Sequence, residues 1–154
     1  MVDVRTVPRS RANPQFNADV LASGLANAEI AYRRVPELGG LRKRQPGVPS
    51  ATNAFWKNES FRNYADYAMG RDFQAGLITL RELGHADRCA IMCAEAVWWR
   101  CHRRIIADYL IAAGEPVFHI LGPGDVEPAR MTSAARTRPS GLLEYPAEAS
   151  LFER

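Results

Sequence analysis

Reactive side chains are concentrated in one short stretch of the chain. Cys93-Ala-Glu95 is followed, four residues later, by Arg100-Cys101-His102-Arg103. A thiol, an imidazole, a carboxylate and guanidinium groups at this spacing are the components of a nucleophilic site, in which a base takes the thiol proton and arginines hold an anion. The sequence therefore offers Cys93 as a candidate nucleophile, His102 as its acid or base, and Glu95 as a further candidate catalytic group.

This stretch falls at a predicted joint between a strand and a helix. The apolar run Cys89–Cys93 predicts a short buried strand, and residues 101–113 predict a helix that ends at Gly114. A thiol at such a joint faces backbone N–H groups and the positive end of the helix dipole, which favour its thiolate form. The joint is therefore a suitable place for thiol chemistry.

The loop does not copy the phosphate-binding loop of cysteine phosphatases or rhodaneses. Trp99 stands six residues after Cys93, where those enzymes have arginine, and the loop between them has no glycine to wrap an anion. Glu95 would also repel a phosphate. The plain alternatives stay open: Cys93 as a small buried residue, and Glu95 as the partner of an arginine.

A metal site is the other chemistry that these residue types allow. The cysteines, Glu95 and His102 are all potential ligands. Cys101 and His102, however, are neighbours on the predicted helix, so their side chains are expected to point about 100° apart. The sequence therefore predicts no metal site and no cofactor.

Strands alternate with helices along the chain, which predicts an α/β fold with three layers, a mainly parallel sheet flanked by helices, in a Rossmann-like arrangement. The predicted strands are 2–7, 30–35, 89–93 and 116–121, and the predicted helices are 18–28, 60–69, 71–84 and 101–113. Residues 1–124 are expected to form a single α/β domain. Residues 125–154 lack a strong period and are expected to be a peripheral C-terminal segment.

In parallel sheets, ligands bind beyond the carboxyl ends of the strands. The loops Arg5–Arg11, Cys93–Arg100 and Gly122–Gly124 leave predicted strand ends, so they are expected to meet at one edge. This predicts a pocket that accepts a small anionic ligand, phosphorylated, carboxylated or nucleotide-like. Its expected lining is Arg5, Ser10, Cys93, Glu95, Cys101, His102 and Arg103, of which Arg5, Ser10, Cys101 and Arg103 are the ligand-binding candidates.

Composition is that of an ordinary globular domain. The 154 residues are 47% hydrophobic and 24% charged, with three cysteines, which is large enough for a hydrophobic core and unlike a disulfide framework. No apolar run approaches the about 20 residues of a membrane helix, and the first residues lack the apolar core of a signal peptide. We therefore expect a cytoplasmic protein with three thiols and no membrane partner; the oligomeric state stays open.

Basic residues are concentrated in the first part of the chain, although the net charge is only +3. A nucleic-acid-binding module that uses the basic segment 33–57 is therefore the alternative function. Its candidate contacts are Arg33, Arg34, Arg42, Lys43 and Arg44. The modest charge is equally typical of a solvated basic face.

Four short motifs, in this order, resemble the family called domain of unknown function 488. They are Asp3-Val-Arg5-Thr-Val-Pro8-Arg-Ser10, Pro36-Glu-Leu38-Gly39-Gly40, Cys93-Ala-Glu95 and Cys101-His102-Arg103. The resemblance implies an α/β fold and a bacterial cytoplasmic protein, without supplying an activity; some relatives carry a DNA-repair label. Family members usually begin with a further strand and helix, so this chain is expected to be an N-terminally short member.

Overall fold

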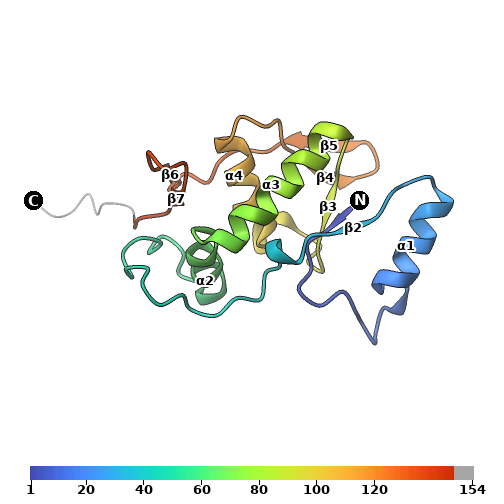
Figure 1. Cartoon of the computed structure of the whole chain (residues 1–154), viewed down its shortest axis with the longest axis horizontal. Coiled ribbons are helices and arrows are strands. Elements are labelled where there is room, and N and C mark those ends of the chain that lie inside the picture. The colour runs from blue at the N-terminus through green and yellow to red at the C-terminus, as the bar shows by residue number, and fades with distance from the viewer. Residues whose placement is uncertain (148–154) are drawn as a thin grey trace, which may run out of the picture.

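The computed structural model describes residues 1–147, which form four α-helices and seven short strands (Figure 1). The helices are α1 (Ala18–Asn27), α2 (Glu59–Ala68), α3 (Arg71–Ala86) and α4 (Arg103–Ala112), with 3-10 helices η1 (Pro14–Phe16), η2 (Pro36–Leu38) and η3 (Trp98–Arg100). The strands are β1 (Val2–Asp3), β2 (Arg33–Arg34), β3 (Ile91–Met92), β4 (Phe118–Gly122), β5 (Asp125–Pro128), β6 (Arg136–Thr137) and β7 (Leu143–Glu144). Within this part of the chain, no helix has the length and apolar character that crossing a membrane requires.

A small parallel sheet brings together three segments that are far apart in the sequence. Its strand order is β2-β1-β3, and Val2 of the central strand lies opposite Arg33 on one side and Ile91 on the other. The backbone N–H of Val4 donates to the Met92 carbonyl at 3.0 Å, which continues the pairing past β1. Because the strands are parallel, the segments that follow all three leave from the same edge of the sheet.

The fold is mixed α/β, as predicted, whereas a three-layer Rossmann-like arrangement is not confirmed. Each parallel strand is assigned over only two residues, and α1, which has no buried residue, stands apart from the other helices in Figure 1. The strand predicted for residues 2–7 ends early because the Asp3 carboxylate accepts the backbone N–H of Arg5 at 3.0 Å. β2 ends at Arg34, and Pro36, which has no N–H to donate, prevents the pairing from continuing beyond Val35.

The fourth predicted strand does not join the parallel sheet. β4 instead pairs with β5 in an antiparallel hairpin, and Gly124 in the turn has a φ of 75°, a conformation that favours glycine. The tight turn returns the chain at once, so β4 pairs with its neighbour in sequence. The loop Gly122–Gly124, expected at the edge of the parallel sheet, is therefore the turn of this hairpin.

Two helices begin at residues other than those predicted. The side chain of Asn58 caps α2, because its oxygen accepts the backbone N–H of Ser60 at 2.9 Å. Cys101 was expected to open α4 but is extended, with a φ of −126° and a ψ of 148°, and the helix begins at Arg103. The end of α4 is as predicted, with Gly114 at a φ of 84°.

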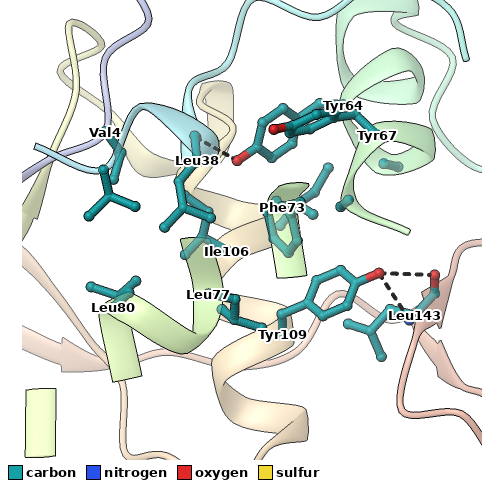
Figure 2. Packing of buried hydrophobic residues seen from close by; sticks show 14 of the residues in the cluster. Val4, Leu38, Tyr64, Tyr67, Phe73, Leu77, Leu80, Ile106, Tyr109 and Leu143 are labelled. Carbon is teal, nitrogen blue, oxygen red and sulfur yellow. Dashed lines mark hydrogen bonds between the residues drawn. The ribbon is translucent and has the colours of Figure 1, made fainter. Parts of the chain in front are cut away.

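The core lies where α3 packs against η2 and α4 (Figure 2). Phe73, Leu77 and Leu80 of α3 are buried, and their helical spacing places them on one face of the helix. The hydroxyl of Tyr64, from α2, donates to the Leu38 carbonyl at 2.7 Å. This bond ties α2 to the segment that follows β2.

The segment after residue 124 also supplies the core. Leu143 and Tyr145 are both 0% exposed, and the Leu143 backbone N–H donates to the Tyr109 hydroxyl at 3.1 Å (Figure 2). This contribution could not be predicted from the sequence, because two buried residues in an irregular segment produce no hydrophobic periodicity. The division of the chain at residue 124 stays a prediction.

Candidate functional site

A cavity of about 410 Å³ lies where the segments after β1, β2 and β3 meet the start of α2. Arg5, Cys93 and Glu95 line this cavity together. So do Cys101 and His102, which immediately precede α4. The structure thus brings together five of the side chains that the sequence assigned to the pocket.

Two other predicted residues lie elsewhere. Ser10 belongs to the loop before α1, where its backbone N–H donates to the Asn17 side chain and its hydroxyl accepts the N–H of Asn13. Arg103 is not part of the cavity lining. It contacts Cys101 and also donates from Nη2 to the Glu95 carbonyl at 2.6 Å, so it supports the loop rather than facing the cavity.

Cys93, Cys101 and His102 form a compact group that we call the sulfur–imidazole cluster. Their two Sγ atoms and a ring nitrogen lie within 4.8 Å of one another. Cys101 Sγ is 2.7 Å from Cys93 Sγ and 3.6 Å from His102 Nδ1. The expectation that Cys101 and His102 point apart is therefore wrong, because Cys101 is extended and only its neighbour turns into α4.

The imidazole of His102 is held in a defined orientation. Its Nε2 lies 3.1 Å from the Val4 carbonyl, and since a carbonyl only accepts, Nε2 carries a proton. Gly40 packs against the other side of the ring: a Cβ at this residue would lie 2.4 Å from Nδ1. The orientation leaves Nδ1 facing the sulfur of Cys101.

The sulfurs are surrounded by N–H donors. The backbone N–H and Nε of Arg103 donate to Cys101 Sγ at 3.4 and 3.2 Å, and the backbone N–H of Glu95 donates to Cys93 Sγ at 3.2 Å. The hydrogen bond from Cys93, helped by His102 and Arg103 against the effect of burial, lowers the pKa of Cys101 to about 4. The same contact raises the pKa of Cys93. The donors favour negative charge on Cys101, because the Arg103 guanidinium donates to its sulfur while Cys93 Sγ accepts a backbone N–H.

The guanidinium of Arg5, a ligand-binding candidate from the sequence, is not free to bind an anion. Its Nε and Nη2 donate to the buried Asp3 carboxylate, with Nη2 at 2.6 Å, and its Nη1 donates to the Phe16 carbonyl at 2.7 Å. Its charge is thus paired inside the protein. The Glu95 carboxylate is exposed and forms no ion pair within residues 1–147, so pairing with Arg5 or Arg103 does not account for it.

Sequence reasoning missed the other side of the cavity. Gly40 and Leu41 come from the segment after β2, and Asn58, Ser60 and Phe61 come from the start of α2. The rule that ligands bind beyond strand ends, applied also to the strand predicted at 30–35, would have pointed to the Gly39-Gly40 pair. Nothing in the sequence pointed to the start of α2, because a long irregular segment separates it from the sheet.

The candidate nucleic-acid residues lie outside the cavity lining. Arg33 and Arg34 are exposed on β2, at the edge of the sheet, where charge discourages pairing with another strand. Arg42 donates to the Gly39 and Pro36 carbonyls and lies over the Tyr67 ring at 3.9 Å. Lys43 and Arg44 are exposed. A role of these residues in nucleic-acid binding stays a prediction.

Gly40→Ala is expected to lower the free energy of unfolding by about 1–3 kcal/mol and to displace the imidazole of His102. The reason is steric, since the added methyl group would lie 2.4 Å from Nδ1. Urea unfolding measures the first effect, and the imidazole NMR resonances of His102 report the second.

Gly84→Ala is the matched control, because nothing lies within 4 Å of a Cβ at this α3 position. Alanine is the better helix former, so this variant should be slightly more stable than the natural chain. If Gly40→Ala were equally harmless, Gly40 would not be what positions the ring.

A family model described as "Domain of unknown function DUF488" matches residues 1–110. Searches found no curated protein and no solved structure that matches the chain. The matched range includes every residue of the cavity lining. The description assigns no activity, so the function has to be argued from the geometry of the cavity.

Proposed function

We propose that this chain, which belongs to the DUF488 family, binds a small ligand with an anionic group in the cavity and presents it to the sulfur–imidazole cluster. The observation that supports this proposal is that the starts of two helices, Arg100 and the sulfur–imidazole cluster all line the same cavity. Its volume of about 410 Å³ is at the lower end of the range for ligand sites, which suits a small molecule.

Positive potential at the cavity comes from helix ends and from Arg100. Asn58 and Ser60 mark the start of α2, and His102 directly precedes α4, so the N-terminal ends of two ten-residue helices face the ligand space. Helix N-termini favour negative charge. The Arg100 guanidinium is exposed and donates to no other group within residues 1–147, which leaves its N–H groups available to a ligand.

An apolar wall accommodates the rest of the ligand. Phe61 and Tyr64, one turn apart on α2, line the cavity, and Leu41 lines it from the segment after β2. Aromatic rings and a leucine contact an apolar or ring-shaped body favourably. We therefore infer that the ligand joins an anionic group to a small apolar or aromatic part.

The cluster supplies the reactive groups. Cys93 is only partly buried, whereas Cys101 is 2% exposed, so Cys93 is the sulfur that a bound ligand reaches first. His102 lies behind the two sulfurs with Nδ1 turned toward them. The Glu95 carboxylate is free of ion pairs within the described residues and is placed to accept a proton from a ligand.

Phenyl phosphate is a suitable probe of this proposal, since it joins a phosphate to a ring. It is expected to bind more tightly than inorganic phosphate, because only the ester contacts the apolar wall. Arg100→Ala should weaken its binding about tenfold, the value of one charge-assisted hydrogen bond at a partly solvated site. Isothermal titration calorimetry measures the affinities.

Arg34→Ala is the matched control, because this variant removes the same charge from an exposed residue on β2. It should bind phenyl phosphate as the natural chain does. An equal loss of affinity in both variants would show that the ester is attracted to any basic protein surface. Equal affinities for inorganic phosphate and phenyl phosphate would show that the apolar wall does not contribute to binding.

A further inference from the structure

We infer that the sulfur–imidazole cluster is a binding site for a thiophilic divalent cation of the zinc type, held by Cys93 Sγ, Cys101 Sγ and His102 Nδ1. Two thiolates and one neutral imidazole form a ligand set that zinc accepts in proteins. The three atoms come from the joint between β3 and α4 and lie within 4.8 Å of one another. The inference deepens the proposed function, on which it rests for the ligand, by naming the reactive centre of the cavity.

The distances suit a tetrahedral ion with one small movement. Zn–S bonds of about 2.3 Å and Zn–N bonds of about 2.0 Å place a sulfur and a nitrogen about 3.5 Å apart and two sulfurs about 3.8 Å apart. Cys101 Sγ and His102 Nδ1 are 3.6 Å apart, which already fits. The sulfurs are 2.7 Å apart, so Cys93 Sγ has to move about 1 Å away from Cys101. It lies within 4.8 Å of His102 Nδ1, and the same movement has to bring it to about 3.5 Å from that nitrogen. The side chain is partly buried and borders the cavity, which leaves it room to move.

The surroundings of the three atoms are those of prepared metal ligands. A ligating histidine usually donates its other N–H to a carbonyl or carboxylate, which fixes the tautomer. His102 does this through Nε2 and the Val4 carbonyl at 3.1 Å, so the lone pair of Nδ1 faces the sulfurs. Backbone N–H groups of Glu95 and Arg103 also donate to the two sulfurs, as they would to metal-bound thiolates.

Charge gives a second, independent argument. Two helix N-termini and Arg100 in the cavity wall favour an anion, whereas the Glu95 carboxylate and two ligating thiolates would place negative charge in the same wall. A divalent cation cancels that charge and is itself attractive to an anion. In the metal-free cluster, negative charge on Cys101 and an anionic ligand would oppose each other in this cavity, whereas a metal-loaded cluster and an anionic ligand act together.

Three protein ligands leave the fourth tetrahedral position open. Structural zinc sites close that position with a fourth side chain, while catalytic sites leave it to water or substrate. Cys93, Cys101 and His102 all line the cavity, so the open position is directed at the ligand space. The site therefore takes the anionic group of the ligand, or a water molecule, as its fourth ligand.

The test uses the full chain, purified under reducing conditions, and Co²⁺ as the probe, followed by competition with Zn²⁺. The expected result is one Co²⁺ per chain with a sulfur-to-cobalt charge-transfer band and the visible bands of tetrahedral coordination, all lost when Zn²⁺ is added. Cys93→Ser and Cys101→Ser should each abolish the charge-transfer spectrum or shift it to that of a single thiolate. Cys89→Ser should leave it unchanged, because Cys89 lies outside the cluster.

Arg103→Ala tests the positioning of Cys101, because its sulfur loses the hydrogen bond from Arg103 Nε and keeps only the one from the backbone N–H of residue 103. It should weaken Co²⁺ binding by about 10-fold or more while keeping the two-thiolate spectrum. Circular dichroism of each variant identifies loss of fold, and Cys93→Ser, at a partly buried residue, remains informative if Cys101→Ser does not fold.

Two outcomes would overturn the inference: no Co²⁺ or Zn²⁺ bound at micromolar concentrations by the reduced chain, or a cobalt spectrum that Cys89→Ser alters as much as Cys93→Ser. Phenyl phosphate titrations separate this inference from the proposed function. If the chain binds phenyl phosphate normally but binds no metal, the proposed ligand site is supported and only the metal inference is wrong. If the chain binds metal but does not bind the ester, the proposed ligand site is wrong and the metal inference is supported.

Discussion

Arg5→Ala is expected to lower the free energy of unfolding by about 3–5 kcal/mol, measured by urea denaturation at neutral pH. Asp3 is 0% exposed and Arg5 is 7% exposed, and the two side chains bond at 2.6 Å. Removing the guanidinium leaves a buried carboxylate with the Tyr32 hydroxyl as its remaining side-chain donor. Such an uncompensated charge costs far more than the lost bond itself.

The pH dependence gives this prediction a distinctive sign. Burial acts to raise the pKa of Asp3, but hydrogen bonds from Arg5 and Tyr32 outweigh burial and hold that pKa below its usual value. In the natural chain, the stability that Asp3 contributes is therefore complete above about pH 4 and is lost as the pH falls through the lowered pKa. In Arg5→Ala burial dominates, and protonation of Asp3 at acid pH relieves the penalty. The stability difference between the two chains should shrink between about pH 7 and about pH 4.

The double variant Asp3→Asn with Arg5→Ala removes both charges. It should cost less than Arg5→Ala alone, because no buried charge is left without a partner. A double variant that is no more stable than the single variant, together with a difference that does not change with pH, would mean that Arg5 stabilises the fold by packing rather than by its charge.

The pairing of Arg5 with Asp3 is predictable from the sequence. Asp3 and Arg5 are two residues apart at a predicted strand, so their side chains point to the same face. An acid and a base on one buried face pair with each other before they serve a ligand. In the proposed ligand site, the hydrogen bonds to the anion therefore come from Arg100, which is exposed on η3.

The sulfur–imidazole cluster could be located from the sequence because its members lie within ten residues. Its geometry could not, since that depends on a single backbone conformation: an extended Cys101 directs its sulfur toward His102 Nδ1, whereas a helical Cys101 would direct it away. A difference of two residues in the start of the helix, from the predicted Cys101 to Arg103, therefore separates a geometry without a metal site from one that has three potential ligands together.

In the fold as well, features set by local sequence patterns could be predicted, whereas features set by contacts between distant segments could not. The buried face of α3 and the end of α4 at Gly114 follow from spacing within one helix. The partner of β4 depends on competition between a hairpin and a distant parallel strand, which the period of one segment does not decide. Strand length likewise depended on the Asp3 side chain, which takes up the Arg5 N–H.

Tyr145→Ala is expected to lower the free energy of unfolding by about 3–5 kcal/mol, as for other large aromatic residues removed from a core. Tyr145 is 0% exposed, packs against Trp56 at 5.2 Å between ring centroids, and donates from its hydroxyl to Asp108 at 3.0 Å. Urea denaturation of the full chain measures the loss. A residue in a peripheral segment would cost less than about 0.5 kcal/mol, so the measurement separates the two descriptions of residues 125–147.

Tyr145→Phe is the control, with an expected cost of about 1–2 kcal/mol, because it keeps the ring and removes only a donor to the buried Asp108 carboxylate. The result bears on the cavity, since Asp108 lies on α4, the helix whose first turn follows the sulfur–imidazole cluster. Tyr145 therefore helps to hold α4 in place from outside the range that the family model matches. If Tyr145→Ala weakens Co²⁺ binding while Tyr145→Phe does not, the ring transmits that support to the cluster; if both leave the cobalt spectrum unchanged, α4 is positioned by the matched region alone.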